Sequence, residues 1–256
     1  ILPSVQFSNA RGPATRDALQ DLRPETLSIS GGSVNENLFM LDGVGVNSFM
    51  YDGDPNSPAA FDEVAGASAQ THWVDSSLVG QLIVRDSNIS AEYGQFTGGV
   101  VEITTRSPRP MFGFEAFYGL PDSSMAEYRM SDRTRNTLGN NAAPDKPDFE
   151  KERFGFSADL PVNERLRLLA AYNRTTATVT NYPIASYAAV GSWGQTSSKE
   201  TYLLKGEYDL AGGMTLTGHV DYSPYDSEFR GTNSVDNLIV SNGGGLTARL
   251  GLKGGQ

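Results

Sequence analysis

Several residue types and patterns are missing from this sequence, and each absence excludes a class of function. The 256 residues include no cysteine, which rules out disulfides and thiolate metal sites. No apolar run approaches the roughly 18 residues that a membrane-spanning helix needs. The two histidines, His72 and His219, lie far apart, without the spacing of a metal-binding motif. Because catalytic signatures such as G-x-S-x-G and H-E-x-x-H are also missing, we predict neither an enzyme nor a bound metal or cofactor.

Positive charge is scarce in the first part of the chain. The formal net charge is −10, and the first lysine is Lys146. Residues 1–108 carry 13 acidic residues and only five basic ones, all of them arginine. An acidic segment of this kind repels a phosphate backbone, so we predict that the protein does not bind nucleic acid.

Strict alternation of apolar and polar residues dominates the second part of the chain, residues 109–256. The clearest segment is Met214–Tyr222, with Leu216 and Val220 on one face and Thr217 on the other. Six such segments, each of about ten residues, predict six β-strands with one apolar face. The side chains expected on that face include Phe114, Phe156, Leu168, Leu204, Leu216, Val220 and Leu250.

The connections between these strands alternate in length. Long polar segments at 121–152, 177–199 and 224–245 separate some strands, whereas short turns at 161–164 and 211–213 join the others. The strands of a soluble β-sandwich also alternate apolar and polar residues, and the composition does not exclude a sandwich. Alternation of long loops with short turns is typical of an outer-membrane barrel, so we favour a barrel whose apolar face points away from the lumen.

The first part of the chain is organised around the stretch from Arg85 to Ser107. An apolar strand ends at Arg85, and Gly94 is expected to allow a tight turn at positive φ. The pair Gly98-Gly99 is expected to let the backbone pass close to another segment, before β-branched residues predict a second strand at Val100–Thr104. Upstream, Met40-Leu41-Asp42-Gly43 predicts a strand that ends in a turn.

In order and spacing, these motifs resemble the plug domain of TonB-dependent outer-membrane receptors. The residues that carry the resemblance are Leu41-Asp42-Gly43, Arg85, Tyr93-Gly94, Gly98-Gly99 and Val100–Thr104. The amino-acid sequence of residues 91–99 is similar to that of the Oar-like branch of the family. One departure is that the Arg-Gly-Pro of the family reads Arg85-Asp86-Ser87 here.

The resemblance implies a fold. It implies a mixed α/β plug domain at residues 1–108, followed at 109–256 by the first six antiparallel strands of a transmembrane β-barrel. The barrel of this family has twenty-two strands around a plugged lumen. We therefore expect the chain to be the N-terminal portion of a longer receptor.

The resemblance also implies a function. A protein of this family lies in the outer membrane of a Gram-negative bacterium, surrounded by outer-membrane lipid, and moves a substrate with energy supplied by TonB. The TonB box is expected upstream of Ile1. Import and export both stay open, as do siderophores, oligosaccharides, peptides and exported proteins as substrates. The alternatives are a structural or adhesive outer-membrane protein that binds a partner through its long loops without transport, and a soluble all-β binding module.

Candidate site residues follow from the same resemblance. The substrate-facing loops of the plug correspond to Ser33, Asn35, Asn47, Phe49 and Tyr51. An alternative is that Phe49 and Met50 pack into the core and leave only Tyr51 exposed. The arginine of Arg-Gly-Pro pairs with barrel glutamates in the family, so Arg85 is the expected latch between plug and barrel, unless Asp86 serves as a local partner.

A weaker pattern suggests a calcium loop. The oxygen-bearing residues at positions 1, 3, 5 and 12 of that loop are Asp52, Asp54, Asn56 and Glu63. Position 6 is Ser57 in place of the required glycine, and Pro55 and Pro58 stiffen the segment. A solvated acidic loop is therefore the preferred interpretation.

Overall fold

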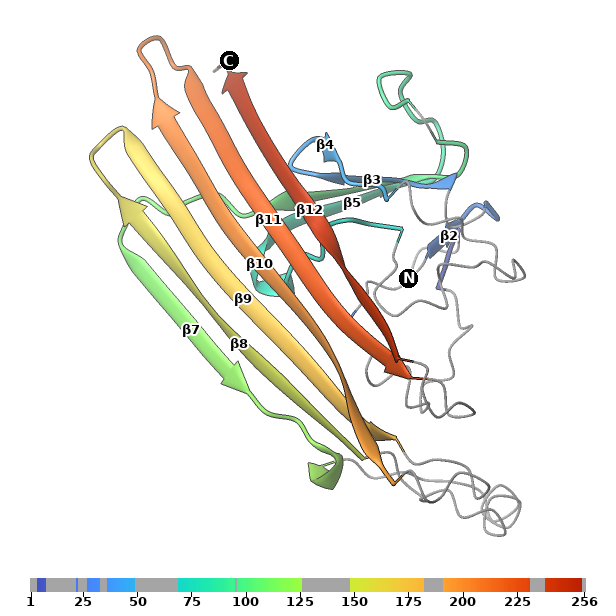
Figure 1. Ribbon diagram of the computed structural model, residues 1–256. Coiled ribbons are helices and arrows are strands. Elements are labelled where there is room, and N and C mark those ends of the chain that lie inside the picture. The colour runs from blue at the N-terminus through green and yellow to red at the C-terminus, as the bar shows by residue number, and fades with distance from the viewer. Residues whose placement is uncertain are drawn as a thin grey trace.

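The computed structural model describes residues 4–7, 22, 27–32, 36–48, 69–94, 96–125, 148–181, 191–230 and 238–254. These residues form three β-sheets and two short 3₁₀ helices (Figure 1). Within the same ranges, no helix has the length and hydropathy that crossing a bilayer requires.

A small four-stranded sheet is built from the first part of the chain. Its strand order is β4-β3-β6-β5, in which β3 and β6 run parallel and the other neighbours run antiparallel. The bounds are β3 Leu38–Leu41, β4 Val44–Gly45, β5 Val79–Arg85 and β6 Val100–Thr105. Beside it, β1 (Val5–Phe7) pairs with β2 (Leu27–Ile29). The buried side chains of Ile29, Phe39, Leu41 and Val101 form the core of this part.

The turn between β3 and β4 is the one predicted from the sequence. Asp42 and Gly43 both adopt positive φ, 46° and 78°, as a two-residue hairpin turn requires. Leu41, which precedes them, is 1% exposed and anchors the turn in the core. The turn places the carboxylate of Asp42 at the end of β3, beside Thr105 at the end of β6.

The double glycine also behaves as predicted. A Cβ atom on Gly99 would lie 2.5 Å from the side chain of Ile29, and one on Gly98 would lie 2.5 Å from Oδ1 of Asn37. The expectation for Gly94 is wrong, because its φ is not positive; among the described residues of this segment, Asn88 has a positive φ of 50°. The nearby turn is closed by the Tyr93 amide, which donates to the carbonyl of Ser90 at 3.1 Å.

The second part of the chain forms one large antiparallel sheet with the order β12-β11-β10-β9-β8-β7 (Figure 1). The bounds are β7 Gly113–Gly119, β8 Asp148–Pro161, β9 Leu166–Asn181, β10 Trp193–Asp209, β11 Thr215–Arg230 and β12 Leu238–Lys253. Each strand pairs with the next one in the sequence, so the six predicted strands and their antiparallel order are confirmed. Two tight turns are also confirmed, since the amide of Val162 donates to Leu166 O at 2.9 Å and that of Leu210 to Met214 O at 2.8 Å.

The strands are longer than the sequence predicted. β9 to β12 have 16 or 17 residues each, and they take up much of the segments 177–199 and 224–245 that were expected to be loops. These extensions are rich in threonine, serine and glycine, so that no apolar face marks them. Their pairing is carried by backbone hydrogen bonds, which need no apolar side chains.

The two faces of the large sheet differ sharply. On the outer face, Phe114, Leu204 and Leu250 are 61%, 53% and 73% exposed, and Leu168 and Leu216 are partly exposed. On the inner face, Leu169 and Leu203 are buried. The expected apolar face is thus exposed and is not packed against a second sheet, which contradicts a sandwich. An exposed apolar face of this extent calls for a covering partner.

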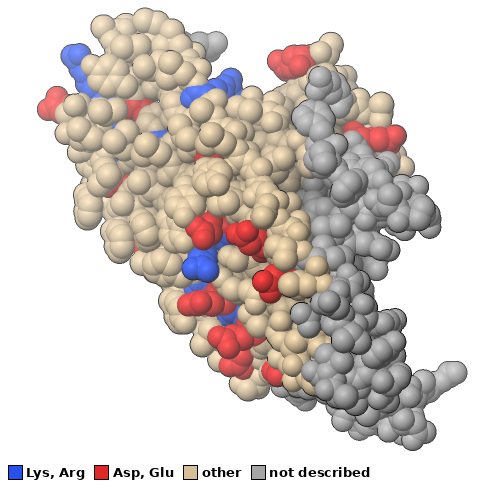
Figure 2. Space-filling model, in the orientation of Figure 1, with Lys and Arg blue, Asp and Glu red and all other residues tan. Residues whose placement is uncertain are grey.

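A row of aromatic rings crosses the outer face. Tyr172 lies 4.8 Å from Tyr202 between ring centroids, Phe156 lies 5.8 Å from Tyr172, and Tyr222 lies 6.0 Å from Tyr202. Leucines and alanines follow on the side of the short turns, whereas charged residues such as Arg174 and Glu200 follow on the other side. Figure 2 shows charged atoms gathered toward the ends of these strands, with a mostly uncharged surface between them. The row thus resembles the aromatic girdle at one boundary of a membrane.

This arrangement predicts a position-dependent cost for a cation on the outer face. Leu204→Arg, on the apolar side of the aromatic row, is expected to lower the free energy of unfolding in lipid bilayers by about 2–4 kcal/mol. Ser198→Arg is the matched control on the same face of β10 beyond the row, and we expect it to cost less than about 1 kcal/mol. Guanidinium titration in vesicles measures both values. Equal costs at the two positions would contradict a lipid-facing band.

Candidate functional site between the two sheets

The small sheet is docked against the inner face of the large sheet through a short 3₁₀ helix, η3 (Ser76–Leu78). Asp75 caps this helix by accepting the amide of Ser77 at 3.0 Å. Leu78 is 1% exposed and packs against Leu169, Ala171 and Leu203 of the large sheet. The two sheets therefore share an apolar contact, and the polar contacts around it decide how firmly they are held together.

The carboxylate of Asp42 lies at the centre of one polar cluster. It accepts the amide of Thr105 at 3.1 Å and also the hydroxyl of Thr105, within the small sheet. From β10 of the large sheet, Nζ of Lys205 donates to Asp42 Oδ1 at 3.1 Å, to Thr105 O at 2.8 Å and to Thr105 Oγ1 at 3.0 Å. All three donors of the ammonium group are thus used. We call Asp42, Thr105 and Lys205 the lysine clasp.

The lysine clasp is buried and is closed on one side by an arginine. The side chains of Lys205 and Asp42 are 10% and 6% exposed. Nη1 of Arg249, from β12, donates to the carbonyl oxygen of Asp42 at 2.7 Å. A Cβ atom on Gly43 would lie 1.6 Å from the same Nη1, so the glycine of the turn is required for this approach.

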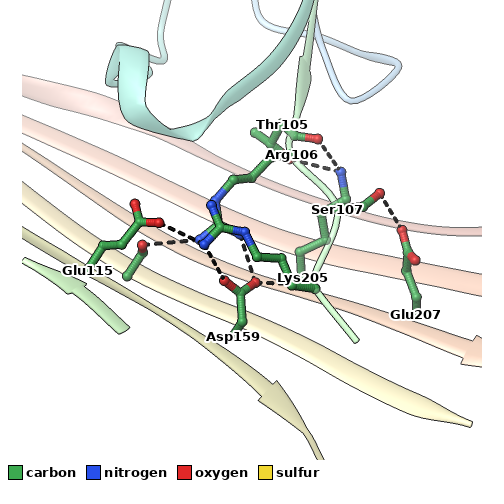
Figure 3. A network of polar contacts seen from close by, with 9 residues as sticks. Thr105, Arg106, Ser107, Glu115, Asp159, Lys205 and Glu207 are labelled. Atoms are coloured by element: carbon green, nitrogen blue, oxygen red, sulfur yellow. Dashed lines mark hydrogen bonds and ion pairs between the residues drawn. The ribbon is translucent and has the colours of Figure 1, made fainter. Parts of the chain in front are cut away.

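A second cluster lies just after β6. Nη1 of Arg106 donates to Asp159 Oδ1 at 2.7 Å (Figure 3). Its Nη2 donates to Ser157 Oγ at 3.1 Å, and both acceptors lie on β8. Asp159 is 1% exposed and also accepts the amide of Arg109 at 3.0 Å. We call this pair of Arg106 and Asp159 the arginine clasp. The two clasps together hold the end of β6 to the large sheet, through two consecutive residues of the chain.

Weaker contacts surround the two clasps. Ser107 Oγ donates to Glu207 Oε1 at 2.7 Å, again from one sheet to the other (Figure 3). Arg109 Nη1 lies 2.7 Å from Glu115 Oε1, and this hydrogen bond with Glu115 raises the pKa of Arg109 above its ordinary value. Ser107, Arg109 and Glu115 are exposed, so we assign these contacts little of the attachment energy.

The two histidines, which the sequence separates, lie close to the same aspartate. Nε2 of His72 is 3.5 Å from Asp221 Oδ1, and His219 is two residues from Asp221 on the same face of β11. Burial lowers the pKa of His72 below its ordinary value, and the charge on His219 lowers it further. A hydrogen bond with Asp221 acts in the opposite direction but does not reverse the shift. Among the residues that the structure describes, no group of three or more His, Asp or Glu side chains is arranged to hold a metal ion.

Arg85, the latch expected from the sequence, makes contacts within the small sheet. Its Nη2 lies 3.8 Å from Glu102 Oε2, its guanidinium lies 5.5 Å from the ring centroid of Tyr93, and its side chain is 40% exposed. Asp86 does not pair with it, and instead accepts the hydroxyls of Ser4 and Ser87. A contact between Arg85 and a barrel glutamate stays a prediction.

Of the predicted substrate contacts, the structure describes Asn47. Its Oδ1 accepts the amide of Phe39 at 2.9 Å and its Nδ2 donates to Asn37 O at 2.8 Å, so its side chain is tied to β3. Ser33, Asn35, Phe49, Tyr51 and the calcium candidates Asp52, Asp54, Asn56 and Glu63 lie outside the described residues. Their proposed roles stay predictions.

The residues of the two clasps were not singled out from the sequence, although a signal exists. Strand alternation places Lys205 and Asp159 on the face opposite the apolar one, where a barrel has its lumen. Charged residues on that face need partners if another part of the chain fills the lumen. The sequence does not say which residue is the partner, because that depends on how the two sheets dock.

Comparison with known proteins supports this architecture. No protein-family model matches the chain. The protein YddB of Escherichia coli (strain K12) is 27% identical over 100 residues, which are 39% of this chain and 12% of YddB. The crystal structure of the outer membrane transporter YddB from Escherichia coli covers 90% of this chain with a TM-score of 0.70 and 19% identity. The siderophore receptor PirA from Acinetobacter baumannii covers 93% of this chain and 40% of its own, with a TM-score of 0.45 and 13% identity.

The match to YddB concerns the fold of one part of a larger protein, since this chain spans 30% of the YddB structure. The resemblance inferred from the motifs is confirmed at the level of the fold. In fold, the chain therefore resembles the part of the outer membrane transporter YddB that it spans.

Proposed function

We propose that the protein is part of a transporter that moves a substrate across the outer membrane with energy supplied through TonB. In this proposal residues 1–108 are the plug and residues 109–256 are strands of the barrel wall. The apolar outer face of the large sheet contacts lipid, and the small sheet lies in the lumen. TonB and outer-membrane lipid are the proposed partners.

The observation that carries the proposal is the contrast between the two faces of the large sheet. Its outer face exposes apolar side chains such as Leu250, 73% exposed, while its inner face holds buried charges such as Lys205 and Asp159 that pair with the small sheet. A barrel wall around a separate luminal domain needs this combination. A movable plug must leave the wall without exposing a large apolar surface. Polar clasps between the two parts meet this requirement, because they can be broken without such exposure.

The substrate contacts are part of the same proposal. The tips Ser33, Asn35, Asn47, Phe49 and Tyr51 are proposed to face the substrate, and Arg85 is proposed to help hold the plug. Neutral amide and hydroxyl groups suit a polar ligand, since they both donate and accept hydrogen bonds.

Energy-dependent uptake tests the proposal even while the substrate is unidentified. Cells with and without the protein are grown in a complex medium, and mass spectrometry follows which solutes leave the medium before and after addition of a protonophore. We expect at least one solute to be removed only by energised cells that contain the protein and TonB.

The same comparison separates transport from adhesion. An adhesive protein would retain a ligand at the cell surface to the same extent in uncoupled cells. Removal of the solute that is independent of TonB and insensitive to the protonophore would therefore contradict the proposed function.

A further inference from the structure

Three cations gather on the inner face of the large sheet, beyond the site where the small sheet docks. Pairing of neighbouring strands aligns Arg153 with Thr175, Thr175 with Lys199, and Lys199 with Tyr225. Lys151 lies two residues from Arg153 on the same face of β8. Arg153 and Lys199 are two strands apart, or roughly 10 Å at the backbone, which their long side chains can span. The charge of Lys199 is attracted by Asp75 and repelled by both Arg153 and Lys151.

Aromatic rings support two of these cations. Nζ of Lys199 lies 5.9 Å from the ring centroid of Trp73, whose ring stacks on that of Tyr225 at 4.9 Å. The guanidinium of Arg153 lies 5.7 Å from the ring centroid of Phe117. Trp73 is itself held to the large sheet, because its amide donates to Ser223 Oγ at 3.2 Å. The cationic side chains are thus positioned by ordered neighbours through cation–π contacts.

Negative charge is in short supply around these cations. Asp75 accepts Nη2 of Arg153 at 3.0 Å and the amide of Ser77 at 3.0 Å. Although burial raises the pKa of Asp75, these hydrogen bonds and the charge of Arg153 hold it below its ordinary value, so one charge is balanced. Within the described ranges, no carboxylate lies within ion-pair distance of Lys151 or Lys199, although both are partly buried. Among the residues that the structure describes, one carboxylate therefore serves three cations.

A buried donor next to the cations also lacks a partner. Asn173 is 6% exposed, and its Nδ2 makes no hydrogen bond to any described residue. Its Oδ1 lies against Gly155, where an added Cβ would be 2.0 Å away, so the side chain points toward β8 beside Arg153. Unpaired donors in a partly desolvated site carry a free-energy cost, which is larger for charged groups than for neutral ones. An anion bound at this site would remove that cost.

We propose that Lys151, Arg153 and Lys199 bind the anionic group of a ligand, a carboxylate or a phosphate, on the inner wall of the large sheet. The inference rests on the proposed function, because it takes this inner face as the wall of the transport path. Carboxylate and phosphate oxygens accept charge-assisted hydrogen bonds from lysine and arginine, and Asn173 adds a neutral donor. The proposed substrate is therefore anionic, which narrows the set of substrates that the sequence left open.

Equilibrium binding to the purified receptor in detergent tests this site. The probes are citrate for carboxylates, pyrophosphate for phosphates and glycerol as a neutral control, each followed by calorimetry at low and high salt. We expect at least one anion to bind, glycerol not to bind, and Lys151→Gln and Lys199→Gln each to weaken the anion roughly tenfold. Lys199→Arg retains the charge and is expected to stay within a few-fold of the original.

The control variant is Lys253→Gln, which removes an exposed lysine from the far end of β12 and is expected to leave anion binding unchanged. Equal binding by the original protein and by folded Lys199→Gln and Lys151→Gln variants would overturn the proposal, as would the absence of binding by both anions. Binding by only one anion supports it and identifies the group that is recognised. These binding measurements need no membrane energy, so absence of anion binding would refute the anion site and leave the proposed energy-dependent uptake untouched. Absence of uptake in cells whose receptor still binds the anion would refute the proposed function and leave the anion site untouched.

Discussion

Lys205→Met is expected to lower the free energy of unfolding by about 3–5 kcal/mol, because it leaves the carboxylate of Asp42 buried without its cation. The side chain of Asp42 is only 6% exposed, so water cannot replace the lysine at low cost. The carbonyl and hydroxyl oxygens of Thr105 lose their donor in the same variant. Denaturant titration of the purified protein in lipid vesicles measures the change.

A double variant separates the unpaired charge from simple loss of packing. Asp42→Asn combined with Lys205→Met removes both charges, so most of the loss is expected to be recovered. Lys253→Met is the matched control at an exposed lysine and is expected to change stability by less than about 0.5 kcal/mol. A loss in the double variant as large as the sum of the two single losses would contradict a coupled pair.

Arg106→Leu is expected to have an effect of similar size through the arginine clasp. Asp159 is 1% exposed and receives its shortest hydrogen bond, 2.7 Å, from Arg106, so removal of the guanidinium leaves a buried charge with only the weaker contacts to Arg109. We expect a loss of about 3–5 kcal/mol, and a small sheet that detaches from the wall more readily.

Two readouts distinguish attachment from general stability in this variant. Protease cleavage within the small sheet should become faster in Arg106→Leu than in Arg109→Leu, which removes an exposed arginine next to it. Arg106→Lys keeps the charge and is expected to restore part of the protection, although not the second hydrogen bond to Ser157. Equal cleavage rates in Arg106→Leu and Arg109→Leu would contradict the role of the arginine clasp.

The extent to which sequence predicts this structure differs between local and long-range features. Local chemistry was sufficient for the turn at Asp42-Gly43, the close approach at Gly98-Gly99 and the apolar outer face, because each depends on one residue type or on a period of two. It failed at the ends of β9 to β12, where polar residues continue the strands without an apolar signal. Gly94 shows the limit of residue type, since a glycine permits a positive φ but does not require one.

The site was less predictable because it depends on contacts between distant segments. Asp42 was singled out as part of a motif, yet its partner Lys205 follows only from the docking of the two sheets. The same holds for Arg106 and Asp159. Arg85 shows the converse case, in which a role implied by family resemblance is not matched by a contact to the large sheet among the described residues.

In the proposed architecture, one face of the large sheet contacts lipid and the other faces the small sheet. Side chains that alternate along a strand should therefore alternate in their exposure to lipid. Spin labels on single cysteines along β11, from Leu216 to Tyr222, test this most directly, because the sequence contains no other cysteine. In outer-membrane vesicles, labels at Leu216, Val220 and Tyr222 are expected to be accessible to oxygen, which concentrates in lipid, and inaccessible to a water-soluble nickel chelate. Labels at Thr217, His219 and Asp221 are expected to be shielded from oxygen. Access of the nickel chelate to all three labels at Leu216, Val220 and Tyr222 would contradict a membrane wall. Oxygen accessibility that does not alternate from residue to residue along β11 would contradict it as well.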